Sequence, residues 1–195
     1  MIKRTIYYEA IKTLLNKWVI DEEENVRFLT QCKGIINHYL YKEGDNNMMT
    51  DKQWKQLNHF EKWEWVKDPD KVSRLLAFST DGIRDRLGRA CYIHVCWDNS
   101  GHSDNSYHYT GQAVDLHFSP PEDPNVVNSH LEEFAVIMSF KEIGGVGFYP
   151  EWGPRPGWHI DTRNRDVKLL WTRVGGKYYY GIDTILKYLG ERKEC

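Results

Sequence analysis

A histidine and an aspartate that stand seven residues apart can both bind a metal ion: His108 and Asp115, within residues 106–118. From Ala113 onward the chain alternates as a β-strand, with three apolar residues on one face and Ala113, Asp115 and His117 on the other. A carboxylate and an imidazole on an otherwise apolar strand cost free energy unless a partner satisfies them. A divalent metal is one such partner, so the stretch predicts a metal site.

A second stretch, residues 157–163, repeats this pattern, because His159 and Asp161 share one face and apolar residues the other. We therefore expect His108, Asp115 and His159 to hold one zinc ion. A catalytic zinc takes three protein ligands and leaves one position for water, which becomes a nucleophile while the metal polarises a scissile carbonyl. Two histidines and one carboxylate also suit Fe(II), so an iron hydrolase is an alternative.

The two stretches resemble the motifs of the D-alanyl-D-alanine carboxypeptidase-type zinc peptidases, which share their zinc-site fold with lysostaphin-type peptidases and the Hedgehog signalling domain. The first family motif, S-x-H-x-x-G-x-A-x-D, is matched in full by Ser106, His108, Gly111, Ala113 and Asp115. The second motif, which in one subgroup continues as D-T-R, matches residues 158–163, and its G-V-G-x-Y-P lead-in matches residues 145–150. The resemblance covers roughly residues 60–173. It implies that the same three side chains bind zinc and that the substrate is a peptidoglycan peptide.

The general base does not follow from the resemblance. Many members place a glutamate three residues before the third ligand, where this chain has Pro156, and others a histidine two residues before it, where this chain has Gly157. Glu151 is the nearest upstream carboxylate, and we favour it as the base over Asp161. Asp161 is the alternative base, or else a group that orients an imidazole. Glu151 is equally compatible with an ordinary solvated loop residue.

The substrate-binding residues also depart from the family pattern. Many members carry an S-G-x-R segment whose arginine binds substrate, and the corresponding residues 97–102 contain no arginine. Arg163 or Arg155 would replace it, since a guanidinium forms a bidentate pair with a carboxylate. The other substrate-binding candidates are Ser106 and His117. We interpret His117 either as a transition-state donor or as a satisfied histidine beside the site. The missing arginine favours an endopeptidase.

The elements that must position these residues follow from periodicity and turn signals. We expect helices over residues 2–18, 22–43, 70–87, 129–143 and 182–189, with Asp68-Pro69 opening the third and Gly88 ending it. We expect strands over residues 91–97, 113–118, 146–149, 157–163 and 166–173, and a Gly-Gly hairpin into residues 178–180. The predicted fold is α+β: a small, mainly antiparallel sheet that carries the ligands and is flanked by helices, as in Hedgehog/DD-peptidase-like domains.

Composition is consistent with one domain over residues 1–195, in which residues 1–50 are a helical extension packed on a 60–173 core. The net charge of −2 and pI near 6.4 give no electrostatic case for nucleic acid or an anionic membrane. Four cysteines without a CxxC pair predict free thiols. No secretory signal and no spanning segment are recognisable, so we expect synthesis in the cytoplasm, action on the cell wall after release, and a monomer.

The residue pattern predicts a metal-dependent hydrolase, and the family resemblance implies a zinc metallopeptidase that hydrolyses a D-alanine-containing stem or cross-link of peptidoglycan. The size and the single domain are compatible with a phage endolysin or a cytoplasmic dipeptidase. The alternative is a zinc-binding, catalytically inactive module that binds the cell wall or a protein. The absence of a base at positions 156 and 157 favours this alternative.

Overall fold

The computed structural model describes residues 48–122, 129–153 and 155–190, all within one compact unit of residues 45–195. The helices predicted over residues 2–18 and 22–43, and the packing of residues 1–50 on the core, lie outside the described residues. None of the helices in the described ranges is long and apolar enough to cross a membrane.

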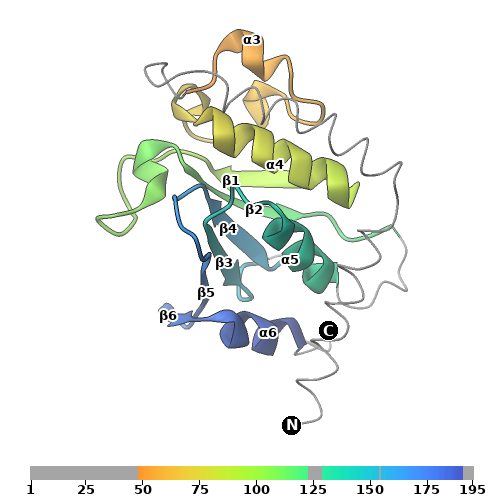
Figure 1. The fold of residues 1–195 in the computed structure, drawn as a ribbon, viewed down its shortest axis with the longest axis vertical. Coiled ribbons are helices and arrows are strands. Elements are labelled where there is room, and N and C mark those ends of the chain that lie inside the picture. Colours follow the sequence, from red (N-terminus) through yellow and green to blue (C-terminus); the bar gives the residue numbers. More distant parts are fainter. Residues whose placement is uncertain (1–47, 123–128, 154, 191–195) are drawn as a thin grey trace. The chain divides into compact units, whose positions relative to one another are not determined.

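Six strands form one sheet in the order β1-β2-β4-β3-β5-β6 (Figure 1). The strands are β1 (Cys91–Val95), β2 (Ala113–Phe118), β3 (Gly145–Tyr149), β4 (Gly157–Asp161), β5 (Leu169–Val174) and β6 (Lys177–Tyr180). Neighbouring strands are antiparallel except β3 and β5, which are parallel. The prediction of an α+β fold with a mainly antiparallel sheet is therefore confirmed.

The helices of the described residues are α3 (Asp51–Trp54), α4 (Arg74–Leu87), α5 (Ser129–Ser139) and α6 (Ile182–Gly190), with short 3-10 helices η1 (Lys62–Glu64), η2 (Pro69–Lys71) and η3 (Tyr107–Thr110). α5 packs on the sheet, where the Phe134 ring stacks on Trp158 with 5.9 Å between centroids. α4 lies beside α5 (Figure 1), and Arg86 Nη1 donates a hydrogen bond to Ser139 Oγ across that contact.

The two faces of the sheet differ in chemistry because side chains alternate along each strand. One face is the core, and its central side chains are at most 1% exposed. These are Val114, Leu116, Phe118, Val146, Phe148, Trp158 and Ile160. The opposite face carries Asp115, His159, Asp161 and the glycines of β3. The alternation seen in the sequence thus separates the packed core from the predicted site residues.

The predicted helix over residues 70–87 begins later than expected. Asp68 caps only the short helix η2, and α4 starts after Ser73, whose hydroxyl accepts a hydrogen bond from the Leu76 amide at 3.2 Å. The chain is extended at Ser73 because its amide donates to the carbonyl oxygen of Gly111. Gly88 ends α4 with a φ of +61°, as predicted.

Several further boundaries differ from the prediction. α5 ends at Ser139, not at residue 143, and Gly145 is already the first residue of β3. β5 begins at Leu169, three residues later than expected, because the Leu169 amide donates to the carbonyl oxygen of Gly144 and so fixes the start of the parallel pairing. Cys91 and Cys96 are buried free thiols, as predicted, whereas Cys32 and Cys195 lie outside the described residues.

Candidate metal site

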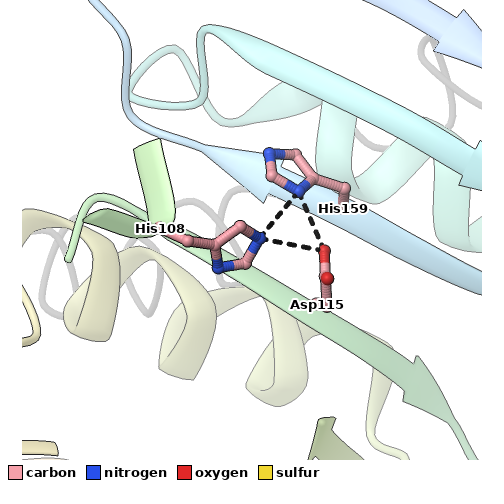
Figure 2. Close-up of side chains that lie close together, drawn as sticks. All are labelled: His108, Asp115 and His159. Atoms are coloured by element: carbon pink, nitrogen blue, oxygen red, sulfur yellow. Dashed lines mark hydrogen bonds and ion pairs between the residues drawn. The ribbon is translucent and has the colours of Figure 1, made fainter. Parts of the chain in front are cut away.

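Three side chains from two strands and a short helix point their donor atoms at one another (Figure 2). His159 Nδ1 lies 2.8 Å from Asp115 Oδ1, and His108 Nε2 lies 3.2 Å from His159 Nδ1 and 3.3 Å from Asp115 Oδ1. All three residues are buried, with 1% to 8% of their surface exposed. We call these three residues the triad.

The sheet register places two members of the triad. Asp115 on β2 and His159 on β4 are directly opposed in the antiparallel pairing, so their side chains leave the same face side by side. Trp158 and Ile160, the neighbours of His159 in the chain, pack into the core on the other face. A shift of either strand by one residue would therefore carry its triad residue into the core.

The third member, His108, is placed by η3. The Ser106 hydroxyl accepts a hydrogen bond from the His108 amide and caps this short helix. Gly111 ends it with a φ of +67°, and a Cβ there would lie 1.7 Å from the carbonyl oxygen of Lys71. Gly111 is thus required both by its backbone conformation and by the close approach of the preceding segment. Ser106, predicted to bind substrate, is occupied as the cap of the ligand-bearing helix.

The donor set fits zinc. Three tetrahedral ligands at 2.0–2.1 Å from a zinc ion are about 3.3 Å from one another, and the three triad distances of 2.8 to 3.3 Å come close to this value. Two imidazoles and one carboxylate are also a donor set that zinc prefers. A fourth position would then belong to water or substrate. The same donors also suit Fe(II).

Asp161 lies behind His159, on the side of the ring away from the triad. His159 Nε2 is 3.1 Å from Asp161 Oδ2, which leaves Nδ1 free to face the other two ligands. Arg163 donates to the same carboxylate through Nε at 2.7 Å and Nη2 at 2.6 Å. Asp161 is fully buried, so its carboxylate orients the imidazole and holds the guanidinium. Of the two roles predicted for Asp161, the geometry matches orientation of an imidazole.

The charges of this cluster are strongly coupled. Burial alone would raise the pKa of Asp115, but the hydrogen bonds and charges of His108 and His159 outweigh it and hold that pKa far below its usual value. Burial alone would lower the pKa of His159, and the carboxylates of Asp115 and Asp161 instead raise it to about 9. The pKa of Asp161 falls to about 2 because His159 and Arg163 outweigh its burial. Without a metal, a protonated His159 is therefore held between two carboxylates.

The glycines of β3 make room for the groups around His159. A Cβ on Gly145 would lie 2.3 Å from Asp161 Oδ2, and a Cβ on Gly147 would lie 2.4 Å from the Trp171 ring. Trp171, on β5, is in register with Gly147 and lies against His159 with 5.1 Å between ring centroids. The G-V-G pattern of the sequence is thus explained by two close approaches beside His159.

The structure does not bring Glu151 to the triad. Glu151 is exposed in the turn after β3, and its Oε2 accepts a hydrogen bond from the Gly175 amide at 2.7 Å. Gly147 is in register with both His159 and Trp171, so Trp171 marks the level of the triad on β5. β5 ends at Val174, just before Gly175, and Val174 is three residues beyond Trp171, roughly 10 Å at the rise of a strand. The Glu151 carboxylate therefore binds near the far end of β5.

The other two predicted substrate-binding residues, Arg163 and His117, contact different neighbours. Arg163 is engaged by Asp161, and its guanidinium also lies over the Tyr107 ring at 4.6 Å. His117 lies on the triad face, but its Nδ1 is 2.6 Å from Nε2 of His94. The His117 ring also stacks on Tyr92. This contact matches the interpretation of His117 as a satisfied histidine beside the site.

Two neighbours of the triad are not among the predicted site residues: Trp171 and His102. His102 stacks on His108 with 4.3 Å between ring centroids. His102 lies in a polar loop without periodicity, and Trp171 on a separate strand, so neither position carries a spacing signal. The Gly145 and Gly147 pair was the available hint that bulky groups lie over β3.

Comparisons of the chain with models of known protein families, with curated proteins and with solved structures found no match.

Proposed function

We propose that the chain is a zinc-dependent peptidase that hydrolyses peptidoglycan peptides, at a D-alanine-containing stem or cross-link, on a Hedgehog/DD-peptidase-like fold. The observation that carries this proposal is the triad, in which His108, Asp115 and His159 turn three donor atoms toward one point. The match to the S-x-H-x-x-G-x-A-x-D motif supports the substrate class through the family resemblance. In the structure, the motif residue Ser106 caps η3, Gly111 ends it, and His108 and Asp115 belong to the triad.

In this proposal, residues next to the triad orient the side chains that bind the metal. When bound, zinc supplies Lewis acidity, which lowers the pKa of water and polarises a carbonyl. Asp161 and Arg163 keep His159 in the orientation that turns Nδ1 toward the triad. Burial of the triad on the sheet lowers the local dielectric and strengthens every charge interaction there.

Hydrolysis also requires a proton acceptor within hydrogen-bond reach of the attacking water. Glu151 remains our proposed acceptor. Its carboxylate is bound to the Gly175 amide, so it serves only after leaving that amide. The proposal therefore includes a rearrangement of the loop after β3 when substrate binds.

An arginine remains to receive a substrate carboxylate. Arg163 is held by Asp161, whereas Arg155 Nε is buried without a hydrogen-bond partner among the described residues. Arg155 lies in the loop that leads into β4, the strand of His159. We therefore assign the carboxylate-binding role to Arg155 in preference to Arg163.

A zinc-binding module without hydrolytic activity is the second candidate function. The placement of both candidate bases favours it, since Asp161 is buried behind His159 and Glu151 is bound to Gly175. Such a module would keep the metal as a structural element and would bind cell wall or protein without releasing peptide ends.

A cleavage assay on purified cell walls tests the proposal. We expect zinc-loaded protein to release new amino ends, and His108→Ala to lose both stoichiometric zinc and this release. His59→Ala is the matched control, because His59 hydrogen-bonds Asp85 on α4 and has no part in the triad. Zinc-loaded wild-type protein that binds walls but releases no ends would favour the inactive module. Stoichiometric iron in protein purified without added metal would replace zinc in the proposal.

A further inference from the structure

The two histidines of the triad are held in different ways. His159 has a carboxylate acceptor, Asp161, on the ring nitrogen that faces away from the triad. His108 has none: its Nδ1 is buried and lacks a hydrogen-bond partner among the described residues. A histidine that binds metal through Nε2 carries its proton on Nδ1, and that N–H normally donates to an acceptor that fixes the ring. Something else must therefore orient His108.

His102 contacts the His108 ring directly. The two imidazoles stack at 4.3 Å between centroids with 19° between their planes, close to the offset-stacked arrangement that aromatic rings favour. His102 is also clamped to the helix that carries His108. The His102 amide donates to the Tyr109 hydroxyl at 3.1 Å, and that hydroxyl donates back to the His102 carbonyl oxygen at 2.8 Å.

An ion pair between Lys67 and Asp98 fastens the start of the loop that carries His102. Asp98 Oδ2 lies 3.7 Å from His102 Nε2 and 3.2 Å from Lys67 Nζ. Lys67 has a φ of +85° and is the one non-glycine residue with positive φ among the described residues. Such a backbone conformation persists only where its surroundings enforce it, and it often accompanies a functional site. Residues 98–102 are thus fastened at Lys67 and at Tyr109, with His102 against the metal ligand.

We propose that His102 is a positioning residue for the metal ligand His108. Its ring holds His108 by stacking, in the role that the hydrogen bond from His159 Nε2 to Asp161 fills for His159. The inference rests on the metal site of the proposed function but not on peptidase activity. It predicts that the shape of the His102 ring matters and that its nitrogens do not.

Metal affinity of the whole chain tests this inference, measured by competition with a chromophoric chelator. We expect His102→Ala to weaken zinc binding about 3- to 10-fold, the range that corresponds to one lost aromatic pair. His102→Phe keeps a ring at the same position and should stay within twofold of wild type. His94→Ala is the matched control, since it removes an exposed imidazole that contacts His117 and not His108. Tyr109→Phe, which removes the clamp and leaves both rings, should weaken binding less than His102→Ala.

The visible spectrum of the cobalt-substituted protein gives a second readout that general destabilisation would not shift. We expect His102→Ala to change the cobalt ligand-field bands, and His102→Phe to leave them as in wild type. Equal loss in the Phe and Ala variants would mean that the His102 nitrogens act directly, and would overturn the inference, as would unchanged affinity in His102→Ala. Wild-type protein without a stoichiometric metal would overturn it as well. Tight metal binding without wall cleavage would instead refute the peptidase proposal alone.

Discussion

Asp115 and His159 face each other across β2 and β4, with 2.8 Å between Oδ1 and Nδ1. The pair is separated by 44 positions along the chain and joined by strand register alone. Cross-strand neighbours on one face of a sheet are held by the backbone ladder, so the relative position of these two donors requires no loop to adopt a special conformation. A site built on strands is positioned more accurately than one built on loops.

Asp115→Asn should abolish tight zinc binding while the fold persists. The substitution keeps the shape but removes the negative charge, and it leaves His108 and His159 without their shared carboxylate. We expect a larger loss than the about 10- to 100-fold that an outer hydrogen-bond partner typically costs. Chelator competition measures it, with Asp166→Asn as an exposed control. A zinc affinity within twofold of wild type would contradict the assignment of Asp115 as a zinc ligand.

Asp161→Asn should weaken zinc binding by about 10- to 100-fold without abolishing it. An amide oxygen still accepts from His159 Nε2, but the charge that holds both His159 and Arg163 is lost. Calorimetric titration with zinc gives the affinity. Complete loss of wall cleavage at saturating zinc, with unchanged zinc affinity, would instead assign Asp161 as the base.

Glu151→Gln should lower the turnover number by about 10²- to 10⁴-fold while zinc stays bound. Glutamine can still accept the hydrogen bond from the Gly175 amide, so the turn stays intact, but it cannot take a proton. Wall cleavage at saturating zinc measures turnover, and metal analysis shows that the site is filled. Full activity of this variant would remove Glu151 from the mechanism.

Most of the sheet and the convergence of the triad were predictable because both follow from local patterns. Alternation placed Asp115 and His159 on the polar faces of their strands, and the burial of Val114 and Trp158 agrees with it. The start of α4 was not predictable from local signals, since a long-range hydrogen bond from Ser73 to Gly111 holds the preceding residues extended.

The surroundings of the triad were harder to infer than the triad itself. His102 reaches His108 only through the path of a polar loop, and Glu151, after β3, reaches Gly175 at the end of the neighbouring strand β5. Hydrogen-bond choices between charged side chains, such as Arg163 with Asp161, depend on three-dimensional distances that residue spacing does not encode.

The stability of metal-free protein should fall as pH rises through the pKa of His159. This pKa is raised to about 9, above the ordinary value near 6.5, because Asp115 and Asp161 stabilise the imidazolium. Folding is therefore favoured by this group fully below pH 6.5, and the contribution is lost between pH 6.5 and about 9. Urea unfolding of chelator-treated protein at pH 6 and pH 9 measures the difference. His159→Phe should remove most of it, and an equal loss in that variant would contradict the assignment.

Gly147→Ala should destabilise the protein by about 1–3 kcal/mol, as overpacked sites do. The added methyl would lie 2.4 Å from the Trp171 ring and would push that ring off His159. Thermal unfolding measures the change. Gly153→Ala is the matched control, because a Cβ there meets no atom within 4 Å. Equal melting temperatures for the two variants would show that Trp171 moves aside without cost.

A metal bound to the triad would cross-link residues that lie far apart in the chain. His108 and His159 are 51 positions apart, and the segment between them contains α5 and β3. An ion that joins them closes this loop, and tethers across long loops oppose unfolding by removing chain entropy from the unfolded state. A metal bound to the triad would thus also tie η3 and β2 to β4, and its removal by a chelator would weaken the attachment of β2 to β4.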